Sequence, residues 1–155
     1  MKEEVNILIA ESDEKHFPLI RDGLRHAGIS NKILRFGDGQ ETLDFLSAEM
    51  GGQRRERKKE YLLLSEVNLP KVDGVEVLRR LKQDLELKKV PVILLTSVDD
   101  PDTVELCHSL GCSMYIVKPA GGKGFADLIR KVGLFLLSVE VPQINGVEET
   151  TGAEE

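Results

Sequence analysis

The chain has 155 residues, of which 41% are hydrophobic and 31% charged, and a formal net charge of -6 at pH 7; this is the composition of one globular domain with its own core. The negative charge argues against a general attraction to nucleic acid or anionic lipid. Because no apolar run approaches the roughly 18 residues of a membrane helix and the first residues lack a signal-peptide layout, we expect a cytoplasmic protein with no membrane partner.

Apolar segments and helical patterns alternate along the chain. Short apolar runs indicate strands at residues 5–10, 32–36, 61–64, 91–95 and 114–117. Apolar positions at helical spacing follow each run, within residues 17–27, 43–46, 75–81, 106–110 and 125–136. The alternation predicts an α/β fold, a doubly wound five-stranded parallel sheet with helices on both faces. We place the domain at residues 1–140 and expect residues 141–155 to form a flexible acidic tail.

Local signals refine these boundaries. Asp38 is a candidate cap for the second helix, and Asp100 with Pro101 provides a cap and a first-turn proline for the fourth. Pro18 lies too deep for a helix that begins at residue 14, so we expect it to cost a hydrogen bond or delay the helix start. The basic run at residues 54–59 is interpreted as a solvated loop, because no interleaved aromatic residues suggest a nucleic-acid contact.

The histidines and cysteines suggest no metal site or disulfide framework. His16, His26 and His108 lie on helical segments without ligand spacing, so surface or packing roles are favoured. Cys107 and Cys112 have no second pair with which to form a four-ligand zinc site. We therefore expect two small, half-buried free thiols.

Polar residues follow four of the predicted strands. In a doubly wound parallel sheet, the functional crevice lies beyond the carboxyl ends of the strands. The residues at those ends are Glu11-Ser12-Asp13, Ser65-Glu66, Thr96-Ser97 and Lys118-Pro119. These side chains are the candidates for a functional site.

Three segments carry a resemblance to a known family. Residues 62–74 resemble the phosphorylation segment of two-component response-regulator receivers, and residues 91–97 and 115–119 resemble the ends of their fourth and fifth strands. The resemblance covers about residues 4–140, and is strongest to the stand-alone, CheY-like group related to phytochrome-associated response regulators. It implies the strand order 2-1-3-4-5 and a role in phosphorelay signal transduction, not catalysis.

The family's functional positions are mostly filled. In the family, an acidic pair and an aspartate hold Mg²⁺, the aspartate accepts a phosphoryl group, and a hydroxyl and a lysine contact the phosphoryl oxygens. The residues here that match the family are Glu11 at the first acidic position, Asn68 with a backbone carbonyl for the metal, and Thr96, Tyr115, Lys118 and Pro119. Pro119 implies a cis Lys118–Pro119 bond, as in the family.

Two positions depart from the family pattern. Glu66 stands at the phosphoacceptor and Ser12 at the second acidic position, while Asp13 resembles the cap of the first helix. The extra methylene of Glu66 displaces its oxygens, and positional errors near 1 Å cost roughly 100-fold in rate. A serine in place of a carboxylate removes one charge from a Mg²⁺ site. We expect at most weak Mg²⁺ binding by Glu11, Glu66 and Asn68, and no required cofactor.

The favoured hypothesis is a phosphorylation-independent pseudo-receiver. Glu66 pairs with Lys118 and contacts Thr96, which biases a switch at Tyr115. With no output domain after residue 140, output passes through a histidine kinase, another signalling protein or a second copy, bound by the fourth helix, fifth strand and fifth helix.

Other interpretations remain open. One is a working response regulator with weak phosphorylation or with phosphorylation at another residue, such as Ser65. Another is a small enzyme that uses the acidic pocket, although no nucleophile–base pair is visible. The pocket can also be a polar remnant without signalling use, with Tyr115 only packing between helix and sheet.

Overall fold

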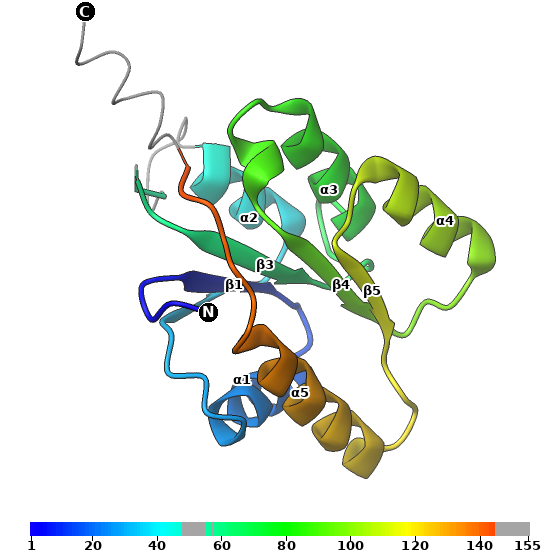
Figure 1. Cartoon of the computed structure of the whole chain (residues 1–155). Coiled ribbons are helices and arrows are strands. Elements are labelled where there is room, and N and C mark those ends of the chain that lie inside the picture. Colours follow the sequence, from blue (N-terminus) through cyan, green and yellow to red (C-terminus); the bar gives the residue numbers. More distant parts are fainter. Residues whose placement is uncertain (48–54, 57, 145–155) are drawn as a thin grey trace, which may run out of the picture.

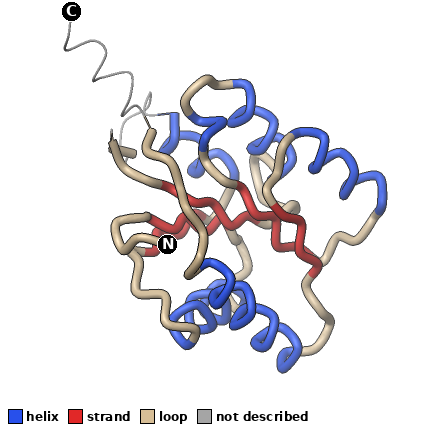
Figure 2. The backbone as a smooth tube through the Cα atoms, viewed as in Figure 1, coloured by secondary structure: helices blue, strands red, loops and turns tan. Residues whose placement is uncertain are grey.

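A computed structural model describes residues 1–47, 55–56 and 58–144. Its centre is a parallel sheet of five strands in the order β2-β1-β3-β4-β5, drawn red in Figure 2. The strands are β1 (Asn6–Ala10), β2 (Ile33–Phe36), β3 (Tyr61–Ser65), β4 (Val92–Thr96) and β5 (Met114–Val117). The predicted fold class and strand order are confirmed.

Helices cover both faces of this sheet (Figure 1). They are α1 (His16–His26), α2 (Gly39–Ser47), α3 (Gly74–Gln83), α4 (Pro101–Leu110) and α5 (Gly122–Leu136), with a short 3-10 turn at Leu87–Lys89. α1 and α5 lie side by side on one face, and α2, α3 and α4 lie on the other. Each helix follows a strand, which is the connectivity that the alternating sequence pattern predicts.

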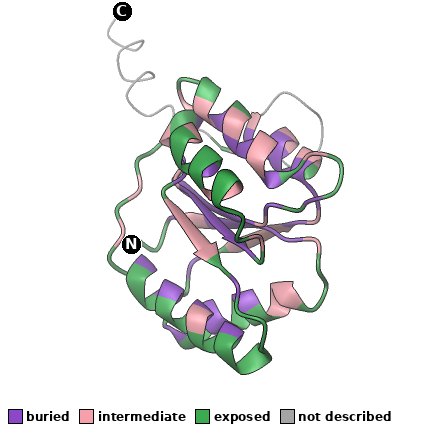
Figure 3. Ribbon diagram, turned by 90° about the vertical axis from the view of Figure 1, so that its right-hand side faces the viewer, coloured by how far each residue is buried: buried purple, intermediate pink, exposed green. Residues whose placement is uncertain are grey.

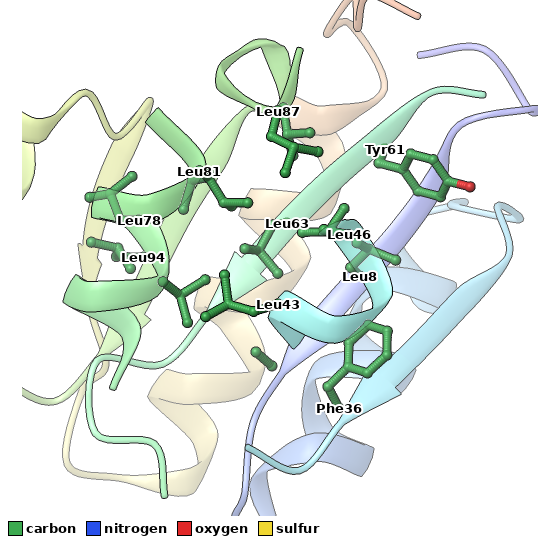
Figure 4. Packing of buried hydrophobic residues seen from close by; sticks show 14 of the residues in the cluster. Leu8, Phe36, Leu43, Leu46, Tyr61, Leu63, Leu78, Leu81, Leu87 and Leu94 are labelled. Carbon is green, nitrogen blue, oxygen red and sulfur yellow. The ribbon is translucent and has the colours of Figure 1, made fainter. Parts of the chain in front are cut away.

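The sheet separates two hydrophobic cores. Every residue of β3 and β4 is buried, as expected for central strands covered on both faces. Leu8, Leu63 and Leu94 point toward α2 and α3 (Figure 4), while Ile9 and Leu64 pack on the α1–α5 side. Figure 3 shows these buried strands between helices whose outer faces are exposed. The cores hold the strand ends in a fixed arrangement.

The predicted capping residues start two helices. Asp38 Oδ1 accepts a hydrogen bond from the Glu41 backbone N–H at 2.7 Å, just before α2. Asp100 Oδ2 accepts from the Thr103 N–H at 3.2 Å, and Pro101 is the first residue of α4. Each carboxylate satisfies a backbone donor that has no partner within its helix.

Helix α1 begins later than its preceding polar residues suggest. Asp13 Oδ1 accepts from the N–H groups of Lys15 at 2.7 Å and His16 at 3.2 Å, so its carboxylate organises the turn that leads into the helix. Pro18 is then the third helical residue, where its missing N–H costs no intrahelical bond. Of the two outcomes expected for Pro18, a lost hydrogen bond or a delayed helix start, the structure shows the delayed start, because α1 begins at His16.

The expected cis bond before Pro119 is absent. The described residues contain no cis peptide bond, so the Lys118–Pro119 bond is trans. An X–Pro bond prefers trans by about 0.5–1 kcal/mol unless tertiary contacts reverse that preference. The family-based expectation was therefore wrong at this bond.

The ordered domain extends past residue 140. Gln143 pairs with Glu60 in an antiparallel bridge, and Ile144 exchanges backbone hydrogen bonds with Lys58 and Lys59. The Ile144 side chain is buried in the α2–α3 core. Residues 141–144 thus belong to the domain and not to a flexible tail, because they bury an apolar side chain and pair their backbone.

Part of the sequence interpretation falls on residues that are not described. Positions 54 and 57 of the basic run and the acidic residues 145–155 lie outside the described residues. Within the described part, no helix has the length and apolar character needed to cross a membrane.

Candidate functional site

Four side chains meet at the carboxyl edge of the sheet. Glu11 and Glu66 directly follow β1 and β3, Thr96 ends β4, and Lys118 directly follows β5. Because all strands run in one direction, their ends share one edge. The structure therefore brings together most of the site residues predicted from the sequence.

Lys118 joins the two carboxylates. Its Nζ lies 2.6 Å from Glu11 Oε1 and 3.3 Å from Glu66 Oε1. The side chains of Lys118 and Glu11 are each 3% exposed, and that of Glu66 is 11% exposed. Two carboxylates share one ammonium, so this group carries a net negative charge inside the protein. Burial makes such pairing obligatory, because an unpaired charge there is costly.

Glu66 is anchored by its own backbone as well as by Lys118. Glu66 Oε2 accepts from the Val67 N–H at 2.7 Å, and the Glu66 N–H donates to the Ala10 carbonyl at 2.9 Å. The Ser65 hydroxyl donates to the Glu66 carbonyl at 2.9 Å. The longer side chain thus folds back beside β3 with both carboxylate oxygens engaged.

The expected contact between Glu66 and Thr96 does not form. Thr96 is fully buried, and its hydroxyl oxygen instead accepts from the Val98 N–H at 3.2 Å. Val98 in turn accepts from the Tyr115 hydroxyl through its carbonyl, at 2.6 Å. Thr96 and Tyr115 are therefore linked to each other through the backbone of Val98.

Tyr115 is half-buried beside this link. Burial raises the pKa of Tyr115 to about 12, and the Glu66 carboxylate and the Cys107 thiolate that forms at high pH act in the same direction. The phenol stays protonated at neutral pH and keeps its hydrogen bond to Val98. The position of Tyr115 thus depends on the conformation of the segment after β4.

His16 is a member of the site that sequence reasoning missed. Its Nδ1 lies 3.0 Å from Lys118 Nζ and 3.9 Å from Glu11 Oε1. Its ring packs edge-on against Phe125 of α5, with centroids 5.3 Å apart. One signal was present in the sequence: a helix that follows a strand of a parallel sheet begins near the carboxyl edge, so its first residue is a candidate for the site.

Ser12 adds no charge to the pocket, and Asp13 lies at its exposed border, with Oδ2 3.9 Å from His16 Nε2. Ser12 is half-buried and neutral. The Asp13 carboxylate faces the backbone N–H groups of Lys15 and His16, and these hydrogen bonds hold its pKa below the usual range. Asp13 therefore acts in the turn before α1, whose N-cap is Lys15 without a side-chain cap hydrogen bond, so Asp13 is not the helix cap itself.

The arrangement fits a divalent cation poorly. Glu11 Oε1 and Glu66 Oε1 face the Lys118 ammonium, and Glu11 Oε2 accepts from the Asp13 N–H at 3.2 Å. Asn68 is exposed in the loop after β3. In the part of the chain that the structure describes, no three histidine, cysteine or acidic residues are placed to hold a metal ion. Mg²⁺ needs a near-octahedral set of oxygens, and a cation would compete with Lys118 for those present.

The remaining histidines and cysteines lie apart from this pocket. His26 is exposed at the end of α1, and His108 lies 3.8 Å from the Cys112 sulfur. Cys107 and Cys112 are free and buried, and burial raises the pKa of the Cys107 thiol to about 11. The predicted free thiols are confirmed, although they are more deeply buried than expected.

Comparisons with known proteins agree with this fold. A model of the response regulator receiver domain matches residues 7–130. The probable methanogenesis regulatory protein FilR2 of Methanothrix harundinacea is 33% identical over 126 residues, which cover 81% of this chain and 77% of that protein.

Solved structures give the same result. The receiver domain from Rhodospirillum rubrum superposes with a TM-score of 0.85 at 34% identity, covering 91% of this chain and 99% of that one. The phosphorylated cyanobacterial phytochrome response regulator RcpA superposes with a TM-score of 0.77 at 28% identity, covering 88% and 97%. These relatives are signalling proteins and indicate no enzyme activity. The chain belongs to the response regulator receiver family.

Proposed function

We propose that this receiver works without phosphorylation at position 66. The observation that carries the proposal is the buried contact of Lys118 Nζ with both Glu66 Oε1 and Glu11 Oε1. The Glu66 carboxylate pairs with Lys118, the residue that contacts the phosphoryl group in the family. A phosphoryl group carries about -1.5 to -2 charges, so Glu66 is a partial and permanent substitute.

A continuous series of contacts supports a link from this charge to Tyr115. The side chain of Lys118 pairs with Glu66, and the backbone N–H of Lys118 donates to the Thr96 carbonyl at 2.7 Å. The Thr96 hydroxyl and the Tyr115 hydroxyl both bond to the backbone of Val98. The Glu66→Gln variant tests whether these contacts are energetically coupled.

The proposed output is binding to another protein. α4, β5 and α5 form one side of the molecule, viewed from the β5 edge in Figure 3. Exposed apolar side chains on these three elements include Leu106 of α4, Val117 of β5 and Phe135 of α5. Such a surface suits a histidine kinase, another signalling protein or a second copy of the chain. The net charge of -6 makes nucleic acid an unfavoured partner.

A second function is a receiver that accepts a phosphoryl group weakly and with the help of Mg²⁺. The phosphorylated state of the relative RcpA favours it. Displacement of the reaction to Ser65 is disfavoured, because this residue is 1% exposed and its hydroxyl is bonded to the Glu66 carbonyl. The two functions therefore differ in whether Glu66 accepts a phosphoryl group.

Incubation with acetyl phosphate and Mg²⁺, followed by intact-mass measurement, distinguishes the two proposed functions. We expect no phosphoryl adduct on the native chain, since the Glu66 oxygens are displaced and engaged. The Ser12→Asp/Glu66→Asp variant restores the family's carboxylates and serves as the matched comparison. A rapidly formed and rapidly lost adduct at Glu66 of the native chain would refute the proposal.

A further inference from the structure

His16 is the outermost member of the charged pocket. Its side chain is 39% exposed, against 3% for Lys118 and Glu11 and 11% for Glu66. Its backbone N–H is held by Asp13 and its ring rests on Phe125. The imidazole is thus fixed from two sides at the solvent boundary of the buried ammonium.

The contact with Lys118 favours one hydrogen-bonding role for the imidazole. A lysine ammonium has three N–H donors and no acceptor. His16 Nδ1 lies 3.0 Å from Lys118 Nζ, where it is placed to accept one of these hydrogen bonds in the tautomer that carries its proton on Nε2. Glu11, Glu66 and His16 then account for all three donors of Lys118.

We propose that His16 is a specificity-determining residue that shields Lys118 from phosphoryl oxyanions. The inference rests on the proposed function and adds a second, separate obstacle to phosphorylation. An incoming oxyanion must displace the imidazole from Lys118 before it can receive that hydrogen bond. This obstacle does not depend on the length of the side chain at position 66.

The test places His16 variants in a background that restores the carboxylates. In Ser12→Asp/Glu66→Asp, the introduced carboxylate oxygen at position 66 forms the new P–O bond to acetyl phosphate. The bond between phosphorus and the acetyl oxygen breaks, and acetate leaves with the electron pair. Intact-mass kinetics at several acetyl phosphate concentrations, with Mg²⁺ fixed, give the maximal rate and the half-saturating concentration separately.

We expect His16→Ala to accelerate phosphorylation about tenfold in this background, because a hydrogen bond to a charged group typically contributes at least that factor. His16→Asn is the conservative variant, since its side-chain oxygen replaces the acceptor atom, and it should stay slow. His26→Ala, at the exposed end of the same helix, should leave the rate unchanged. Equal rates with and without His16, whether measurable or zero, would overturn the inference.

A measurement on the native chain covers the case in which a variant does not fold. Nitrogen-15 NMR of the histidine rings should show His16 Nδ1 as the nitrogen that accepts the hydrogen bond from Lys118, and Lys118→Met should shift that signal. A proton on Nδ1 in the native chain would contradict the shielding role. Phosphorylation of the native chain at Glu66 would instead refute the proposed function, so the two failures are distinguishable.

Discussion

The carboxyl edge of the sheet has two halves that differ in the kind of contact they make. In the charged half, Lys118 is held by the side chains of Glu11, Glu66 and His16. In the hydroxyl half, Thr96 and Tyr115 meet through the backbone of Val98. The charged half consists of ion pairs around the Lys118 ammonium. The hydroxyl half consists of hydrogen bonds between uncharged groups and the backbone of the loop after β4.

The contacts of the two halves differ in how much free energy it costs to break them. Buried ion pairs are costly to break, because the remaining partner is left charged and unsolvated. Neutral hydrogen bonds to loop backbone contribute about 1 kcal/mol each and exchange more readily. We infer that the charged half sets the state of the site and the hydroxyl half responds to it.

The largest effect should come from removing the shared cation. Lys118→Met leaves the buried Glu11 and Glu66 carboxylates unpaired, so we expect a loss of about 3–5 kcal/mol in the free energy of unfolding. Urea denaturation measures this loss. Lys123→Met, at an exposed position of α5, is the matched control and should change stability by less than about 0.5 kcal/mol. A similar small change for Lys118→Met would remove the distinction between the two halves.

The two carboxylates should contribute unequally. Glu11 lies closer to Lys118 than Glu66 does, at 2.6 Å against 3.3 Å, and is more deeply buried. Glu11→Gln should therefore destabilise the fold by about 2 kcal/mol and Glu66→Gln by less, on the scale of charged hydrogen bonds. Parallel urea titrations would show which variant loses more free energy of unfolding. A larger loss for Glu66→Gln would contradict the stronger contribution expected of Glu11.

The hydroxyl half should show smaller but coupled effects. Thr96→Val removes the acceptor for the Val98 N–H, and Tyr115→Phe removes the donor to the Val98 carbonyl. Each should cost about 1 kcal/mol. Because both bonds hold one residue, the double variant should lose less than the sum of the two single losses. Strict additivity in a double-mutant cycle would show that the two hydroxyls act independently.

The effect of Tyr115 protonation appears only at alkaline pH. Its pKa is about 12 in the folded protein, above the ordinary value of 10.0, because burial disfavours the phenolate. The folded state thus holds this proton more tightly than the unfolded chain. The associated stability is complete below about pH 10 and is lost as the pH rises through 12. In Tyr115→Phe, absorbance titration should lose the Tyr115 transition near pH 12 and keep that of Tyr61, whose pKa burial also raises. A transition near pH 10 for Tyr115 would contradict the buried placement.

Sequence reasoning predicted the fold and most of the site for a common physical reason. Apolar periodicity defines the strands and helices, and parallel strands bring their carboxyl ends to one edge. Glu11, Glu66 and Lys118 could therefore be placed together from the order of strands and polar residues along the chain. The capping roles of Asp38 and Asp100 followed from local rules that need no tertiary contact.

The missed features depend on tertiary packing. His16 reaches Lys118 across 102 positions of sequence, in a geometry set by its own contact with Phe125. Ile144 docks as a single side chain, and one buried residue produces no periodicity. The link through Val98 uses backbone atoms, which any residue type offers.

The most direct test of the central claim compares Tyr115 in the native chain and in Glu66→Gln. The account predicts that loss of the fixed charge changes the NMR signals of the Tyr115 ring and weakens binding to the partner protein. Glu14→Gln, which alters an exposed ion pair with Arg35, should change neither. Unaltered Tyr115 signals and unaltered partner affinity in Glu66→Gln would contradict the account.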